Sequence, residues 1–258
     1  QLEQNQGDES RLIARFYAMN ASFEELDYAK TPLGELILRR RRVLSLDQDV
    51  YEVKLNDSFL MSSLVNASEI ALADRCLEKL TCSDMKVAVG GLGLGYTAHA
   101  ALSHRNVGSL LVIEYLSAII GWHERDLVPL GASLTDDNRC KFVNADFFSL
   151  ASNPQQGLDL EYPGRRFDAI LVDIDHTPDY LLDEASSNFY SENGLATLAR
   201  HLEPNGVFGL WSAGEPDDSV VNRLETCFES AEASVVEFTN PLLSLDDRNT
   251  IYIGISPS

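Results

Sequence analysis

Hydrophobic and polar residues alternate over the part of the chain that follows residue 31. The alternating segments are residues 33–38, 42–46 and 50–55. Such alternation is typical of β-strands that bury one face. Candidate turns stand at Arg39-Arg40 and at Asp47-Gln48-Asp49. The pattern therefore predicts a small antiparallel β-sheet, preceded by a lead-in that is helical or irregular.

A different pattern begins near residue 68, where helical periodicity and short apolar runs take turns. The expected helices are residues 68–80, 96–103, 116–127, 191–202 and 218–229. The expected strands are residues 86–90, 109–114, 140–144, 167–173, 206–211, 234–238 and 250–255. The run at 167–173 is apolar throughout its centre, as in a strand covered on both faces. This alternation predicts a doubly wound, Rossmann-like α/β domain.

The last two expected strands are separated only by residues 239–249. This loop is too short for a helical crossover, so we expect the two strands to form an antiparallel C-terminal hairpin. The predicted organisation is a lead-in over residues 1–30, a small N-terminal β-sheet over 31–67 and the Rossmann-like domain over 68–258.

The chain is strongly acidic. Its 258 residues include 20 Lys and Arg against 40 Asp and Glu, which gives a formal net charge of −20. Such a surface repels phosphate backbones, so we expect no nucleic-acid partner. Most of the acids are expected to be solvated at the surface, and the charge is compatible with a cationic substrate. The one basic cluster, Arg39 to Arg42, favours a solvated hairpin end or pairing with the chain's own acids over a phosphate site.

Membrane and secretory signals are missing from the sequence. No apolar run approaches the roughly 20 residues that span a bilayer, and the polar, acidic residues 1–10 do not have the pattern of a signal peptide. The four cysteines are scattered, with no C-x-x-C pair. This distribution favours reduced thiols over a zinc site or a disulfide framework. We therefore expect a cytoplasmic protein with no membrane partner.

The most informative segment is Val87 to Gly95, where an apolar run ends at Gly90-Gly91-Leu92-Gly93-Leu94-Gly95. A strand that turns through glycines into a helix brings backbone N–H groups up to a ligand. Glu114 ends the next expected strand, and Asp146 follows the one after it. The carboxyl ends of neighbouring parallel strands meet at one edge of a sheet, where such folds bind ligands. These features predict a nucleoside pocket, with helix caps or loop acids as the structural alternative for the two acids.

The order of these motifs resembles that of the spermidine synthase family of polyamine aminopropyltransferases, in its spermidine synthase-like branch. The resemblance covers residues 30–255. It includes the small β-sheet, Gly90 to Gly95, Val112-Ile-Glu114, Asn144-Ala-Asp146, Ile170-Leu-Val-Asp173, Asn188-Phe-Tyr190 and Leu202-Glu-Pro-Asn-Gly-Val207. It implies a class I methyltransferase-type sheet, and it implies a homodimer, because members of the family often form dimers with help from the N-terminal sheet.

The resemblance also implies the ligand and its contacts. The co-substrate would be S-adenosylmethionine or its decarboxylated form, without a metal. Glu114 would bind the two ribose hydroxyls. Asp146 would accept from the adenine amino group, with Phe147 beside the ring. The backbone would approach the sulfonium-bearing tail at Gly91, Gly93 and Gly95.

The resemblance assigns the catalytic role to the segment after the strand at 167–173. Asp173 matches the first of two family acids, which takes a proton from the attacking amine, but His176 stands where the second acid is expected. Asp175 could substitute only if the backbone differs. His176 could shuttle a proton, or it could be a capping or loop histidine. The three residues lack a further convincing ligand, so we expect no metal site.

Three departures from the family pattern concern the acceptor. Gly93 or Leu94 stands where the family's glycine turn carries an Asp, whose bond to an ammonium is worth about 1.5–3 kcal/mol. Residues 57–63 lack the family's Tyr-Gln/His-Glu segment, and His176 replaces the second acid. All three losses fall on aminopropyl or polyamine contacts, so the sequence predicts an intact nucleoside pocket with a changed small-molecule acceptor. The net charge of the chain is compatible with a cationic one.

The favoured hypothesis is therefore an S-adenosyl-dependent transferase that transfers a methyl group. An aminopropyltransferase with a divergent acceptor site and a non-catalytic nucleoside-binding regulatory protein remain as alternatives. A nicotinamide dehydrogenase would account for the glycines and Glu114 but not for Asp146 or the terminal hairpin. The segment 178–187 is expected to form a lid. Tyr180 and Trp211 are assigned to packing rather than to a sulfonium contact.

Overall fold

The computed structural model describes residues 23–242 and 244–258. The chain divides into two compact units, with the boundary between Leu64 and Val65. Most of the predicted lead-in, residues 1–22, lies outside the described residues.

The first unit is a four-stranded antiparallel sheet in the order β1-β2-β3-β4. Its strands are β1 (Phe23–Thr31), β2 (Gly34–Val43), β3 (Gln48–Leu55) and β4 (Ser58–Ser62). The small antiparallel sheet is thus confirmed, but the extension of the lead-in to residue 30 is wrong, because β1 occupies its last residues. A register shift between Glu25 and Asp27 interrupts the alternation of β1 and weakens its signal in the sequence.

The turn expected at Arg39-Arg40 is also wrong, because β2 runs straight through the four arginines. Each arginine pairs with an acid of the same unit. The pairs are Arg39 and Arg41 with Glu52, Arg40 with Glu24, and Arg42 with Asp47 and Asp49. Opposite charges on neighbouring strands stabilise their pairing. The expected pairing of this basic cluster with the chain's own acids is therefore confirmed.

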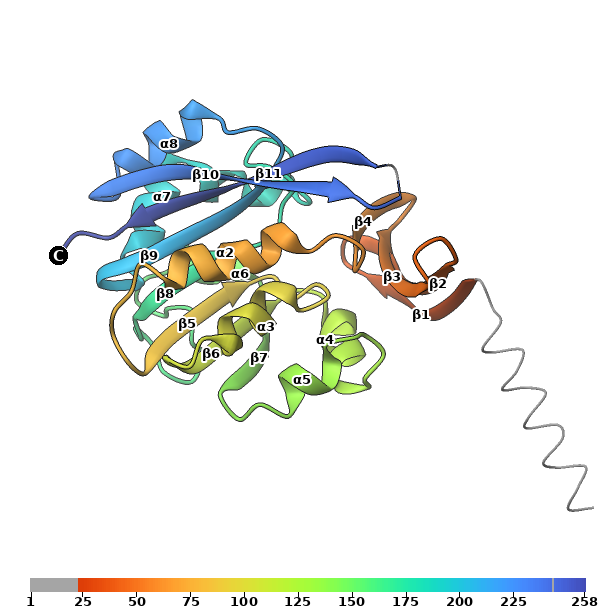
Figure 1. Ribbon diagram of the computed structural model, residues 1–258. Helices are drawn as coiled ribbons and strands as arrows, with labels where there is room; N and C mark the ends of the chain where they lie inside the picture. The colour runs from red at the N-terminus through yellow and green to blue at the C-terminus, as the bar shows by residue number, and fades with distance from the viewer. Residues whose placement is uncertain (1–22, 243) are drawn as a thin grey trace, which may run out of the picture. The chain divides into compact units, whose positions relative to one another are not determined.

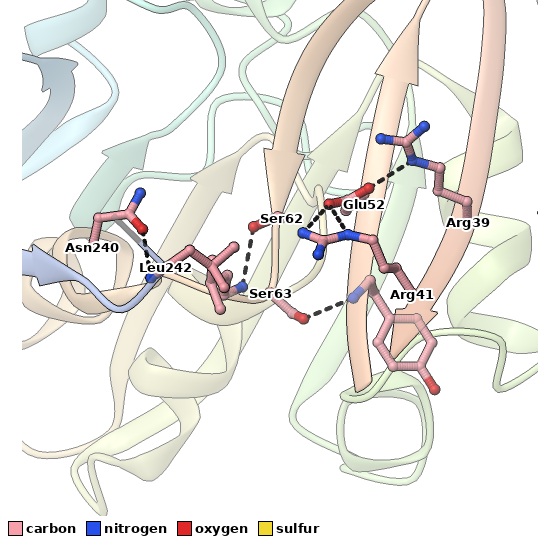
Figure 2. Close-up of polar contacts among 9 residues, drawn as sticks. Arg39, Arg41, Glu52, Ser62, Ser63, Asn240 and Leu242 are labelled. Atoms are coloured by element: carbon pink, nitrogen blue, oxygen red, sulfur yellow. Dashed lines mark hydrogen bonds and ion pairs between the residues drawn. The ribbon is translucent and has the colours of Figure 1, made fainter. Parts of the chain in front are cut away.

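Glu52 is the buried member of this set, at 4% exposure. Its Oε2 accepts from Arg39 Nε at 2.6 Å, and its Oε1 accepts from Arg41 Nε and Nη2 at 3.0 and 2.9 Å. Figure 2 shows both guanidinium groups directed at this carboxylate. Charge-assisted bonds of this kind are short and strong. One acid on β3 therefore offsets two cations that would otherwise repel each other along β2.

The second unit is built on a seven-stranded sheet in the order β10-β11-β9-β8-β5-β6-β7. The strands are β5 (Met85–Gly90), β6 (Val107–Glu114), β7 (Cys140–Asn144), β8 (Phe167–Val172), β9 (Leu202–Ala213), β10 (Ser230–Asn240) and β11 (Leu245–Ile255). Strands β5 to β9 are parallel, whereas β11 is antiparallel to both β9 and β10. This confirms the doubly wound, class I methyltransferase-type sheet with its antiparallel C-terminal hairpin.

Helices cover both faces of this sheet. They are α2 (Ala67–Leu77), α3 (Tyr96–Ser103), α4 (Ser117–Glu124), α5 (Gly131–Thr135), α6 (Phe147–Ala151), the 3₁₀ helix η1 (Glu184–Tyr190), α7 (Glu192–Ala199) and α8 (Asp218–Glu225). In Figure 1, α2 and α3 lie in front of the sheet. A Cβ at Gly209 of β9 would stand 2.4 Å from the Cys76 sulfur of α2, so this helix lies directly on the strand.

A large apolar cluster lies on the opposite face of the sheet. It joins Ile170, Phe208 and Tyr252 of the sheet to side chains of α6, α7 and α8. The sheet is therefore buried on both sides, in keeping with its apolar central strands. None of the helices in the described part of the chain has the length and hydropathy needed to cross a bilayer.

Candidate active site

The glycine turn follows β5 and leads into α3. Its backbone has positive φ at Gly91 (+93°), Gly93 (+48°) and Gly95 (+91°). A Cβ at Gly91 would stand 2.2 Å from the main-chain oxygen of Asp173. Glycine is therefore required at this position both by conformation and by space. The turn lies directly against the end of β8, as the sheet-edge argument predicts.

Glu114, at the end of β6, is joined to the same turn. Its Oε2 accepts from the Leu92 N–H at 2.9 Å, and its Oε1 accepts from the Leu116 N–H at 2.8 Å. The side chain is 6% exposed. Burial raises the pKa of Glu114, and main-chain N–H donors partly offset this effect. The main-chain N–H groups of Gly93 and Tyr115 also act on this carboxylate. Binding of ribose hydroxyls by Glu114 stays a prediction.

Asp146 is the N-cap of α6. Its Oδ1 accepts from the Phe148 N–H at 3.0 Å, and its Oδ2 accepts from the Ser149 hydroxyl at 2.6 Å. The structural alternative of a helix cap is therefore present. It does not use all the acceptor capacity of the carboxylate, so a contact to an adenine amino group stays a prediction.

Phe147 lies in the core rather than at an open surface. It is 2% exposed, and its ring centroid stands 5.8 Å from those of Phe148 and Phe189. The absence of a side chain at Gly90 makes room for this ring, because a Cβ there would stand 2.8 Å from it. The expected position of the Phe147 ring beside an adenine is not supported by this packing.

Asp173 follows β8 and is partly buried. Its N–H donates to the Gly90 carbonyl at 2.9 Å, and its Oδ2 accepts from the Thr97 hydroxyl at 2.8 Å. Burial raises the pKa of Asp173 to about 6, and the bond from Thr97 acts in the opposite direction. A carboxylate with a pKa near neutrality is suited to accept a proton.

Glu69 is a residue of this site that the sequence analysis did not identify. It lies in the first turn of α2, and its Oε2 accepts from the Ser68 hydroxyl at 2.8 Å. Burial and the nearby Asp173 carboxylate raise the pKa of Glu69 to about 7. An acid at this helical position usually indicates no more than a favourable interaction with the helix dipole. The sequence therefore gives no sign that Glu69 lies in the candidate site.

Asp175 has its carboxylate oxygens occupied by the segment that follows it. The side chain is 4% exposed; Oδ1 accepts from the Leu182 N–H at 2.7 Å, and Oδ2 accepts from the Tyr190 hydroxyl at 2.7 Å. Asp175 thus holds the predicted lid, residues 178–187, and η1 against the end of β8. This geometry favours anchoring of the segment by Asp175 over a catalytic role in place of the second family acid.

His176 lies within the same segment. Its ring centroid stands 5.6 Å from that of Tyr180, which is 67% exposed, and its carbonyl accepts from the Ala213 N–H at 2.8 Å. These contacts agree with a loop histidine, and proton shuttling by His176 stays a prediction. Within residues 23–242 and 244–258, no group of three or more His, Cys, Asp or Glu side chains could hold a metal ion.

The anchoring role of Asp175 predicts the behaviour of Tyr190→Phe. Losing a bond to a buried carboxylate costs about 1.5–3 kcal/mol, so local opening of residues 176–190 should increase by at least about tenfold. Limited proteolysis at low protease concentration measures this opening. As a control, Tyr162→Phe removes the hydroxyl of a tyrosine that is 63% exposed, and it should leave the rate of proteolytic cleavage unchanged. Equal cleavage of wild type and Tyr190→Phe would contradict the assignment.

The fold has counterparts among solved structures. The chain is similar to a spermidine synthase crystallised with the transition-state analogue AdoDATO and to spermidine synthase from Thermotoga maritima. In both cases the TM-score is 0.67, the identity is 15% and the match covers 90% of this chain, with 73% and 72% of the other chains. No protein-family model and no curated protein sequence matches the chain. The likeness shows a spermidine synthase-like fold, and at this identity it shows the fold alone.

Proposed function

We propose that the chain is an S-adenosyl-dependent transferase that moves a methyl group from S-adenosylmethionine to a small cationic acceptor. The observation that carries the proposal is the direct linkage of three features at one sheet edge. The Leu92 N–H of the glycine turn donates to Glu114, and Gly91 lies against the main-chain oxygen of Asp173. The glycine turn, the proposed ribose-binding Glu114 and Asp173, whose pKa is raised, thus lie together.

The residues present fit such a donor. Glu114 would accept from the ribose hydroxyls, and Asp146 has remaining acceptor capacity for an amino group. The turn presents no side chain at Gly93. Within the described residues, neither Glu69 nor Asp173 forms an ion pair with a Lys, Arg or His. Buried carboxylates are costly without a positive partner. A ligand that carries a sulfonium cation would supply one.

When bound, the donor would supply an electrophilic methyl group on a positively charged sulfur. The chain's own part is to align the nucleophile, exclude water and remove one proton. Asp173 would accept the proton that the acceptor loses as its nucleophilic atom forms the new bond to carbon. The thioether leaves without protonation, so no general acid is required.

Methyl transfer is favoured over aminopropyl transfer by the glycine turn. Gly93 has no side chain, and Leu94 is 3% exposed, so the turn offers no carboxylate to an aminopropyl ammonium. The aminopropyl alternative is supported by Glu69 and Asp173, since two acids without a cation could hold an ammonium. A non-catalytic binder would gain nothing from a base at Asp173.

Calorimetric titration separates these alternatives. The ligands are S-adenosylmethionine, decarboxylated S-adenosylmethionine, methylthioadenosine and NAD. We expect S-adenosylmethionine to bind more tightly than the decarboxylated form and NAD not to bind. Tighter binding of the decarboxylated form would favour aminopropyl transfer, and binding of NAD alone would contradict the proposal.

Asp146→Ala should lower the affinity for every adenosyl ligand by about 10- to 100-fold, which is the effect of losing one hydrogen bond to a charged acceptor. The same variant also loses a helix cap, which costs about 1 kcal/mol of stability. Asp146→Ser retains a hydroxyl that can cap the helix. Compared with Asp146→Ala, it should therefore recover more of the folding stability than of the ligand affinity. Asp136→Ala removes an exposed acid of equal charge and should bind normally. Unchanged affinity in Asp146→Ala would remove Asp146 from the site.

A further inference from the structure

The backbone of the glycine turn reaches the surface at Gly93. The leucines on either side, Leu92 and Leu94, are 5% and 3% exposed, whereas Gly93 is partly exposed and has a φ of +48°. Glycine adopts many backbone conformations at little steric cost, so such a turn does not by itself fix the direction of its peptide groups. A ligand that meets the turn at Gly93 therefore requires this direction to be held by another part of the chain.

His123 of α4 makes such a contact. Its Nε2 lies 3.0 Å from the Gly93 carbonyl oxygen, and the side chain is fully buried. A carbonyl oxygen only accepts hydrogen bonds, so Nε2 carries a proton and donates it. The other ring nitrogen, Nδ1, is buried and has no hydrogen-bond partner within residues 23–242 and 244–258. The bond to Gly93 is therefore the hydrogen bond that joins this imidazole to the rest of the described chain.

Packing fixes the ring of His123 in this position. A Cβ at Gly95 would stand 2.8 Å from His123 Cε1, so the ring fits against the turn because Gly95 has no side chain. Phe142 of β7 makes a T-shaped contact with the same ring, at 5.8 Å between centroids. Burial lowers the pKa of His123, and the bond to Gly93 acts in the opposite direction. The imidazole is therefore neutral at neutral pH, with its proton on Nε2.

Gly93 is held at both of its main-chain groups. Its N–H acts on the Glu114 carboxylate at the end of β6, and its carbonyl accepts from His123 of α4. The described chain has no cis peptide bond, so the C=O and N–H of each peptide point in opposite directions. Because the Gly93 carbonyl is directed at α4, the Leu94 N–H of the same peptide points away from this helix. Reversal of the peptide would exchange the two groups.

We propose that His123 is a positioning residue, which holds the Gly93–Leu94 peptide of the glycine turn in the orientation that binds the donor. The proposal rests on the proposed function for the identity of the donor as an adenosyl ligand. The physical reason is that a buried donor or acceptor without a partner costs more than a neutral hydrogen bond gains. Without the His123 bond the turn would adopt another orientation, and a ligand would have to restore the first one.

Two substitutions at His123 separate the hydrogen bond from the volume of the side chain. Methionine and glutamine have similar length and volume, but only glutamine has an N–H donor, at about the place of the histidine Nε2. Calorimetry should show that His123→Met binds S-adenosylmethionine about tenfold more weakly than wild type, the effect of one unpaired carbonyl. His123→Gln should recover most of this loss. Unchanged affinity in His123→Met, or an equal loss in both variants, would overturn the proposal.

His201→Met is the matched control for a loss of stability alone. His201 is also buried, and its Nε2 lies 2.9 Å from the Ala151 carbonyl oxygen. Its main-chain carbonyl accepts from the N–H of Phe167, the first residue of β8, so it lies at the sheet edge opposite to the glycine turn. This variant should lower the melting temperature as His123→Met does and keep the affinity. An equal loss of affinity would assign the effect to stability and overturn the proposal.

Two measurements without ligand do not depend on the proposed function. In wild type labelled with ¹⁵N-histidine, NMR at neutral pH should show the proton of His123 on Nε2, with the ring identified by its nuclear Overhauser contact with Phe142. A neutral ring with its proton on Nδ1 would overturn the proposal, even if every variant fails to fold. The Gly95 amide, which donates to the Leu92 carbonyl at 2.8 Å, should exchange its hydrogen faster in His123→Met than in wild type or His123→Gln.

The two sets of measurements distinguish the failure of one proposal from the failure of the other. If Gly95 exchange changes as expected but wild type binds no adenosyl ligand, His123 positions the turn and the proposed function fails. If wild type binds S-adenosylmethionine and His123→Met changes neither the exchange nor the affinity, the proposed function stands and His123 has no positioning role.

Discussion

Asp173→Asn should slow transfer by about 10²- to 10⁴-fold, the usual contribution of a positioned general base. The amide is nearly isosteric with the carboxylate and can still accept the Thr97 hydroxyl, but it cannot take up a proton. Binding of S-adenosylmethionine should fall far less than the rate, because the glycine turn, Glu114 and Asp146 would still hold the nucleoside. Transfer of a labelled methyl group to a panel of small amines measures the rate, and calorimetry measures the binding.

The pH profile gives the same assignment an independent check. Asp173 accepts a proton only when it is ionised, and its pKa is raised to about 6. The wild-type rate should therefore rise as the pH increases through about 6. Asp218→Asn makes the same change at an exposed acid of α8 and should keep both the rate and the profile. Full activity in Asp173→Asn would show that another group removes the proton.

Gly91→Ala should abolish measurable nucleoside binding, a loss of more than about 100-fold, and lower the free energy of unfolding by about 2–4 kcal/mol. The new Cβ would stand 2.2 Å from the Asp173 carbonyl oxygen, at a backbone φ of +93°. Relief of this contact must move either the turn or the end of β8, and both carry the site. Urea unfolding and calorimetry measure the two effects.

Gly214→Ala is the matched control for this substitution. Gly214 has a similar φ of +78°, but no atom lies within 4 Å of the position of a Cβ. It should therefore show the conformational cost of about 1 kcal/mol without the loss of binding. If the two variants behave alike, strain rather than the contact with Asp173 explains the effect at Gly91.

Much of the α/β fold could be predicted from the sequence, because its strands are buried on both faces. The run at residues 167–173 is apolar enough to be recognised alone, and the short separation of the last two expected strands predicts the hairpin. The strands extend into this separation, so the connecting turn is shorter than the expected loop at 239–249. The first two strands of the small antiparallel sheet were harder to predict. Strand β1 carries few apolar residues. The four arginines of β2 resemble a turn in the sequence, because their pairing with acids on neighbouring strands depends on contacts that the sequence does not show.

The short helices and the functional acids show a second limit. Helices α5 and α6 have 5 residues each, too few for a hydrophobic period to appear. The sheet-edge rule identifies acids that follow strands, so it found Glu114, Asp146 and Asp173. It could not find Glu69, which begins a helix. Nor could it separate these acids from Asp175, whose buried carboxylate bonds to Leu182 and Tyr190 of the segment that follows it.

The position of β11 has a consequence for how the second unit assembles. This strand follows β10 in the chain but lies between β9 and β10 in the sheet. During synthesis, β9 is therefore an unpaired sheet edge and β10 has no neighbour until the residues of β11 leave the ribosome. Insertion of this segment joins both at once. The half of the sheet beside Asp173 must then be completed last, and a stalled nascent chain would present the unpaired N–H and C=O groups of β9 to chaperones or to other chains.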